Sequence, residues 1–157
     1  MPLETASDQT AGRQAWRRNI MEILAKADLD RLEAAWDQLP NKPEYSSVRG
    51  PETGLVMIRG RIGGGGAPFN LGEATVSRAT IRLATGEIGF GHTLGLQPRK
   101  AELAAVFDAL AQREDRRGAV EGLVGDIERE LAERDERRKR ETAATRVDFF
   151  TMVRGED

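Results

Sequence analysis

The sequence predicts an α+β protein in which an antiparallel sheet of about four strands is preceded and followed by helices. Apolar residues recur at helical spacing towards both ends of the chain, whereas in the middle they stand at every second position. Short connections join the alternating segments. We therefore expect a single domain over residues 1–157. It would comprise a helical hairpin at 1–43, antiparallel strands at 45–96, helices at 98–141 and a last strand at 146–153.

The first 43 residues predict two helices joined by a short turn. Trp16, Ile20 and Leu24 fall on one face of the first helix. Asp28 is suited to cap a second helix, and Pro40 is suited to end it. We expect the two helices to form a hairpin whose tryptophans pack in the core or at an interface rather than serve as ligand platforms.

Three strands are predicted in the central segment. In the first, around residues 55–62, one face is apolar and the other turns from apolar to cationic along its length. The second, 73–83, places Arg78 and Arg82 opposite its apolar side. In the third strand, four residues share one face: Ile88, Phe90, His92 and Leu94. We expect His92 to be a hydrogen-bonded histidine of the core. Short links between consecutive strands predict antiparallel pairing.

Helical spacing returns after Pro98, and it fades from Glu133 to Glu141, where charged residues dominate. We interpret that stretch as a solvated helix end, with a peptide- or RNA-binding arm as the alternative. The last segment, 146–153, is apolar on both faces. This pattern predicts a strand buried on both sides, either added to the sheet or inserted into a partner subunit.

The composition makes a complete active site difficult to build from this chain. There are no cysteines, which excludes disulfides, thiolate metal sites and a cysteine nucleophile. The single histidine, His92, leaves no conventional zinc site in prospect, and no serine stands in a nucleophile elbow. We assign no catalytic residue, metal or cofactor to this chain. Without a signal-peptide pattern or an apolar run of about 20 residues, we expect a soluble, cytoplasmic protein.

The glycine-rich segment GGGGAPFN at 63–70 is the most unusual motif. The net charge is −2, yet residues 45–100 carry seven basic and three acidic side chains. A basic segment favours an anionic ligand or an acidic partner surface. Consecutive glycines can form an anion-binding concavity, and nearby arginines can add bidentate contacts to a phosphate. The candidate anion- or partner-binding residues are therefore Arg59, Arg61, Gly63, Gly64, Gly65, Gly66, Asn70 and Glu73.

Two alternatives remain open for this segment. It is neither a Walker A motif, because the GK[ST] ending is absent, nor a Rossmann GxGxxG, because a strand follows it rather than a helix. A plain hairpin turn, or a loop that contacts another subunit, fits the residues as well as a phosphate site does. His92, Arg99 and Lys100 are weaker candidates for the same functions.

Four segments of the chain are distinctive enough to compare with known families. The longest is PETGLVMIRGRIGGGGAPFNLGE at 51–73. The others are RQAWRRNIMEILAKA at 13–27, LGLQPRKAELAAVFDAL at 94–110 and ATRVDFFTMVRG at 144–155. In this order along the chain they resemble the PhnG family, whose members are a subunit of the bacterial carbon–phosphorus lyase core complex. The charged stretch 113–141 matches no motif of that family.

The resemblance implies an accessory subunit that acts on phosphonates together with other proteins. The expected partners are PhnI most directly, with PhnH, PhnJ and PhnL. The assembly would use ATP and an alkylphosphonate, displacing adenine to form α-D-ribose 1-methylphosphonate 5-triphosphate. The resemblance identifies no catalytic residue, and leaves open whether the subunit organises PhnI or lends cations to a shared substrate site. The alternative from another class is a free-standing nucleotide- or RNA-binding module, which usually presents more aromatic stacking platforms than this chain offers.

Overall fold

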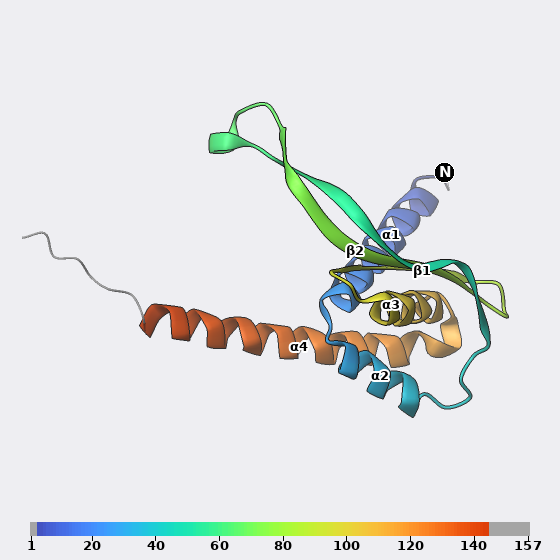
Figure 1. Cartoon of the computed structure of the whole chain (residues 1–157). Coiled ribbons are helices and arrows are strands. Elements are labelled where there is room, and N and C mark those ends of the chain that lie inside the picture. The colour runs from blue at the N-terminus through green and yellow to red at the C-terminus, as the bar shows by residue number, and fades with distance from the viewer. Residues whose placement is uncertain (1–2, 145–157) are drawn as a thin grey trace, which may run out of the picture.

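The computed structural model describes residues 3–144 and has an α+β architecture (Figure 1). Its elements in chain order are α1 (Leu3–Lys26), α2 (Leu29–Gln38), β1 (Tyr45–Gly60), η1 (Ile62–Gly64), β2 (Phe69–Leu83), β3 (Ile88–Leu94), α3 (Pro98–Ala111) and α4 (Glu114–Ala144). The predicted fold class is confirmed.

The sheet is antiparallel and contains three strands in the order β1-β2-β3, rather than the four or so that were predicted. The last described element is a helix, since α4 continues past residue 141 to Ala144. The strand predicted at 146–153 lies outside the described residues.

Helix α3 occupies the centre of the molecule and packs on the inner face of the sheet, formed largely by β2 and β3. From Lys100 to Ala111, every residue of α3 except Glu102 is buried. The β2 residues on this face are Ser77, Ala79, Ile81 and Leu83, as the period-two pattern predicts. Several alanines of α3 allow its neighbours to approach closely.

The prediction for β3 was wrong about which face is buried. Gly89 and Gly91 face α3, and a Cβ built on either would lie 1.9 Å from a carbonyl oxygen of the helix. The larger residues of the strand, including Phe90 and His92, are therefore on the exposed face. The helix packs directly on the strand backbone, so the smallest side chains form the inner face and His92 is not a core histidine.

The predicted N-terminal hairpin is also corrected, because α1 and α2 each pack against α3. Ile20 and Leu24 of α1 and Leu32 of α2 belong to one core cluster that includes α3. Asp28 precedes α2, but its carboxylate makes no capping hydrogen bond and instead accepts from Arg134 of α4 at 3.1 Å. The apolar faces of both helices are thus covered by the central helix.

Helix α4 packs on the body through its first half and projects beyond it through its second (Figure 1). Its buried residues are Val120, Leu123, Val124 and Ile127. Arg31 of α2 bridges Asp126 and Glu130 of α4, both at 3.1 Å. After Arg134 the helix is exposed, consistent with the charged sequence there. Among the residues the structure describes, no helix has the length and apolar character needed to cross a bilayer.

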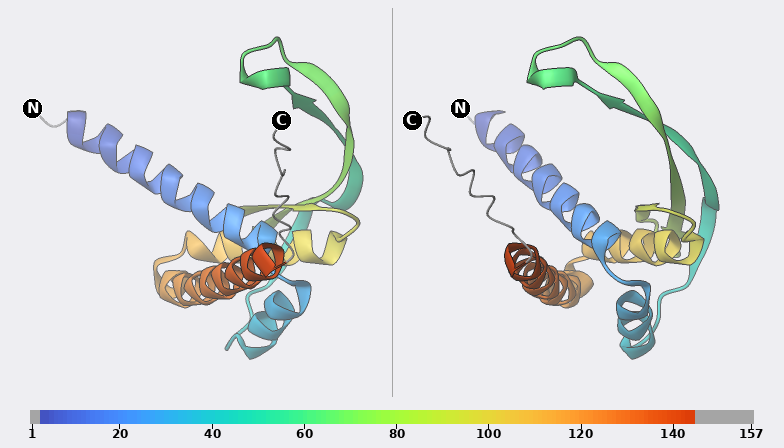
Figure 2. Two further views of the ribbon diagram at one scale, coloured as in Figure 1. Left: turned by 90° about the vertical axis from the view of Figure 1, so that its left-hand side faces the viewer. Right: turned by 60° about the vertical axis from the view of Figure 1, so that its left-hand side comes forward.

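The distal halves of β1 and β2 form a two-stranded arm that extends well beyond the three-stranded part of the sheet (Figures 1 and 2). Strand β3 pairs with β2 only from Val76 to Arg82, so the arm, which we define as residues 53–75, has no third strand. Figure 2 shows the arm rising from the body and arching over towards the side on which α1 extends, with η1 and the glycine loop at its tip.

Candidate functional site

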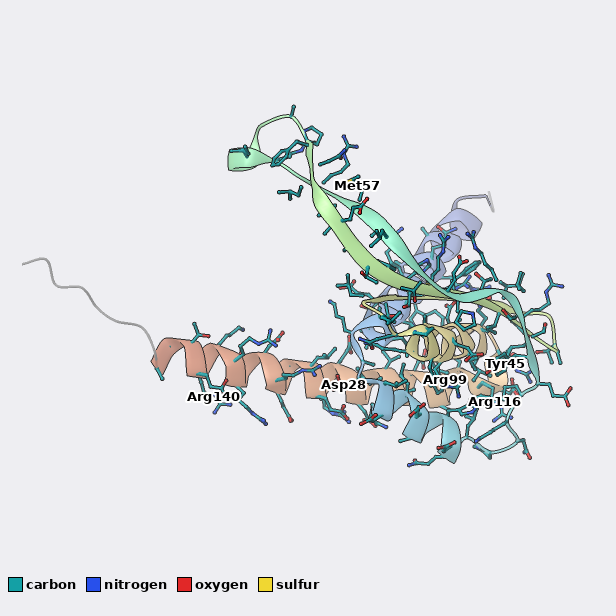
Figure 3. The ribbon with its side chains drawn as sticks, in the orientation of Figure 1. Asp28, Tyr45, Met57, Arg99, Arg116 and Arg140 are labelled. Carbon is teal, nitrogen blue, oxygen red and sulfur yellow. The ribbon has the colours of Figure 1, made fainter. Side chains whose placement is uncertain are left out.

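The predicted anion- or partner-binding residues lie together at the distal end of the arm. Arg59 is the second-to-last residue of β1 and is the register partner of Asn70 on β2. Arg61 is extended and immediately precedes η1. Glu73 lies opposite Met57, two register pairs closer to the body than Arg59 and Asn70. The register therefore places these residues on a projecting hairpin, which Figure 3 shows with Met57 labelled, rather than in the helical core.

The glycine run folds into a compact tip. Gly63 has a φ of 64°, a left-handed conformation that side chains rarely adopt, so glycine is favoured there. A Cβ on Gly66 would lie 3.1 Å from the carbonyl oxygen of Ile62, which closes the turn. At the base of this tip the Leu71 side chain of β2 lies over Gly60 of β1. A Cβ added to Gly60 would lie 2.3 Å from the Leu71 Cδ1 atom. The glycines thus allow the chain to reverse while neighbouring apolar residues pack closely.

The tip arginines differ from most arginines of the body. Within residues 3–144, Arg59 and Arg61 make no hydrogen bond or ion pair, and both are exposed. By contrast, Arg49 and Arg78 at the base of the arm both donate to Glu52, at 2.8 and 2.6 Å. These two hydrogen bonds lower the pKa of the Glu52 carboxyl, with Arg78 the larger cause. The tip therefore presents two cations whose charge the described fold leaves uncompensated.

The weaker candidates are on the body, away from the tip. Arg99 donates to Glu102 at 2.7 Å. Burial lowers the pKa of Arg99, but hydrogen bonds to Glu102 and Tyr45 outweigh it, so that pKa lies above its ordinary value. Lys100 is only 8% exposed, and burial lowers its pKa. His92 lines an open hollow of about 580 Å³ between α1 and β3. These three residues do not form one site with the glycine loop.

Large apolar side chains surround the tip and cover the arm. Four consecutive residues of β1 are 43–64% exposed: Leu55, Val56, Met57 and Ile58. They are joined by Ile62, Phe69 and Leu71, which are 40–77% exposed. Because successive strand residues point to opposite faces, both faces of the arm are apolar. As expected from sequence, one face of β1 stays apolar and the other, carrying Leu55 and Met57, turns cationic at Arg59; the structure adds that neither face is covered within the described residues.

A polar network that the sequence did not predict joins α1, α3 and the free edge of β3. Asp108 is 0% exposed and accepts two hydrogen bonds from Arg17, at 2.8 and 2.7 Å. It also accepts from the backbone N–H of Phe90 at 2.8 Å, while Arg17 donates to the carbonyl of Ile88 at 3.0 Å. The only sequence signal was an aspartate inside the apolar stretch AAVFDAL. The network stabilises the edge of the sheet.

Within residues 3–144, no group of three or more histidine, cysteine, aspartate or glutamate side chains is placed to hold a metal ion. The buried polar side chains have partners in the fold: Ser77 accepts from the backbone N–H of Gln97 at 2.9 Å and donates to the carbonyl of Gly95 at 2.8 Å. The most distinctive surface of the described molecule is thus the apolar arm with its cationic tip.

Fold and surface together define a small α+β protein with a projecting, apolar β-hairpin. Residues 15–155 match the family model described as "Phosphonate metabolism protein PhnG". The chain therefore belongs to the PhnG family. It is 61% identical to a Rhizobium meliloti (strain 1021) protein over 143 residues, which is 91% of this chain and 92% of that protein. The relative is named alpha-D-ribose 1-methylphosphonate 5-triphosphate synthase subunit PhnG.

Proposed function

We propose that this chain is an accessory subunit of an α-D-ribose 1-methylphosphonate 5-triphosphate synthase, the step in which an alkylphosphonate displaces adenine from ATP. The observation that carries the proposal is the 61% identity to a named subunit of that synthase, across nearly the full length of both proteins. Membership of a phosphonate-metabolism family supports it independently.

Within this assembly the subunit acts as an organiser rather than as the source of catalytic groups. Supporting this role, no buried side-chain nitrogen or oxygen in the described residues lacks a hydrogen-bond partner. Asp108 is held by Arg17, and Ser77 by the backbone around β3 and α3. Groups committed to the fold in this way are not free to transfer protons. The expected partner is PhnI most directly, with PhnH, PhnJ and PhnL in the same cytoplasmic assembly.

A second role is favoured by one feature of the tip. Arg59 and Arg61 have no partner within the described residues and stand beside a glycine turn, so they could instead bind a triphosphate or phosphonate in a site shared with another subunit. This role also places the chain in the synthase, but it would make the tip part of the substrate site.

Reconstitution tests the proposed function. The remaining synthase subunits are purified with and without this chain, ATP and methylphosphonate are supplied, and adenine release is measured. We expect substantial release only when the chain is present, and none from the chain alone. Full activity of the assembly without this chain would disprove the subunit role. Adenine release by the purified chain alone would disprove the accessory role.

A further inference from the structure

The arm exposes apolar surface in a form that an isolated hairpin does not sustain. Leu55 is 64% exposed and Met57 53% on one face of β1, while Val56 is 47% and Ile58 43% exposed on the other. A two-stranded hairpin is at best marginally stable in water without a third strand or a layer packed against it. Contiguous exposed apolar patches on soluble proteins mark interaction sites.

Both edges of the arm are also open within the described residues. Strand β1 pairs only with β2, and β2 from Phe69 to Ala74 pairs only with β1. Unpaired backbone N–H and C=O groups along an exposed strand are a template for association with another chain. The arm therefore combines two apolar faces with two free edges, while the body of the protein has its core covered by helices.

The charge at the tip indicates the chemistry of the partner. Between residues 53 and 75 the arm carries two basic side chains, Arg59 and Arg61, and one acidic side chain, Glu73. Burying the tip against an apolar surface would leave both guanidinium groups without a partner, which is costly. The surface that receives the tip must therefore provide carboxylates. A second copy packed arm to arm would offer only one carboxylate, Glu73, for the two guanidinium groups of each arm.

We propose that the arm is buried on both faces by another subunit of the synthase, in an apolar groove that places carboxylates opposite Arg59 and Arg61. The inference rests on the proposed function and specifies how the subunit attaches. The arm extends beyond the three-stranded part of the sheet and stands clear of the helices over most of its length, which leaves its faces accessible to such a partner (Figures 1 and 2).

The test uses three double variants of the full chain. One alters the first face (Leu55→Ser with Met57→Ser) and one alters the second (Val56→Ser with Ile58→Ser). The matched control removes two large apolar side chains that are exposed outside the arm (Val48→Ser with Leu96→Ser), 51% and 76% exposed. Binding of each variant to the remaining synthase subunits, immobilised one at a time, is measured by biolayer interferometry.

We expect each arm variant to raise the dissociation constant for one subunit at least about tenfold, as loss of buried apolar anchors does, and the control to change it less than about twofold. The isolated variants should keep the wild-type circular dichroism spectrum and melting temperature, because the altered side chains lie outside the core cluster.

The possible outcomes distinguish a failure of the proposed function from a failure of the docking inference alone. If the wild-type chain binds none of the subunits, the proposed function itself fails, and the inference with it. If the wild type binds and both arm variants bind equally well, the docking inference alone is disproved. Loss of binding in only one arm variant would disprove burial on both faces. An isolated wild-type dimer that either arm variant dissociates would identify a second copy as the occupant and overturn the proposal.

Discussion

Asp108 illustrates how a single carboxylate connects three elements of this fold. It is fully buried on α3, yet it accepts two hydrogen bonds from the Arg17 guanidinium and one from the backbone of β3. The hydrogen bond to Asp108 is the largest cause of the raised pKa of Arg17. Because the Phe90 N–H lies on the strand edge away from β2, the carboxylate supplies the partner that a further strand would provide.

The first prediction at the residue scale is that Asp108→Ala lowers the free energy of unfolding by about 2–4 kcal/mol, because it leaves the Phe90 N–H and the Arg17 guanidinium unpaired in a partly buried site. Urea unfolding followed by circular dichroism at neutral pH measures this change. Arg17→Met should cost a similar amount, since it removes the cation that balances the buried Asp108 carboxylate and leaves that carboxylate only the Phe90 N–H as a donor.

The double variant and a neighbouring control make this prediction specific. Asp108→Ala combined with Arg17→Met should cost clearly less than the sum of the two single changes, because each single change already breaks the pair. Arg18→Met, on the exposed side of α1 and without an ion pair in the described residues, should change stability by less than about 0.5 kcal/mol. Additive losses would show that the pair does not act as a unit.

At the scale of elements, the contact between β3 and α3 decides the orientation of the whole strand. Gly89 and Gly91 alternate with larger residues, and the strand backbone lies directly against the backbone of α3 near Ala101 and Ala105. Small residues on both sides permit this approach, and no side chain fits between them. Because of this close packing, the larger residues Phe90, His92 and Leu94 of β3 face outwards.

The second prediction concerns this contact. Gly91→Ala should lower the free energy of unfolding by about 1–3 kcal/mol or more, because the added Cβ would lie 1.9 Å from the Ala101 carbonyl oxygen and 2.8 Å from the Ala105 nitrogen, both backbone atoms of α3. Gly54→Ala is the matched control, since nothing lies within 4 Å of its built Cβ. Thermal unfolding compares the two; equal melting temperatures would show that α3 can shift at no cost.

The sequence predicted correctly those helices and strands in which apolar residues recur at a regular helical or alternating spacing. The change from helical to alternating spacing and back predicted helices around a central antiparallel sheet, and the alternation in the second strand predicted which side of β2 is buried from Ser77 onwards. The face of β3 was predicted wrongly because apolar size normally indicates burial, whereas here glycine forms the packed face. The hairpin of α1 and α2 failed because both apolar faces have a third partner, α3, which no local pattern reveals.

At the scale of the whole molecule, the body and the arm differ in how completely they are covered. Around α3, helices and sheet bury a single continuous core. Along the arm, alternation predicted which residues share a face, but alternation carries no information on whether any other element covers that face. The candidate residues of the glycine segment, which are neighbours in sequence, lie together at the tip, while the projection of that tip away from the body could be learned only from the structure (Figure 3).

The last prediction separates docking from substrate binding at the tip, and belongs to the assembled synthase. Arg59→Ala combined with Arg61→Ala should weaken association with the partner subunit by about 2 kcal/mol or more, because carboxylates buried opposite the arginines would lose their partners. Once the partner is saturated with the variant, the KM values for ATP and methylphosphonate should equal those of the wild type. Arg18→Ala combined with Arg82→Ala, two exposed cations outside the arm, should change neither quantity.

The opposite pattern would identify a different role for the same two arginines. If the complex keeps its affinity while KM for ATP or methylphosphonate rises, the guanidinium groups bind substrate oxygens, and the tip belongs to a shared active site. If both quantities stay unchanged, neither role holds, and docking through the arm depends on its apolar faces alone. Binding by biolayer interferometry and initial-rate kinetics at saturating subunit concentration must therefore be measured on the same preparations, because a weakened complex left unsaturated would lower the rate and imitate a loss of catalysis.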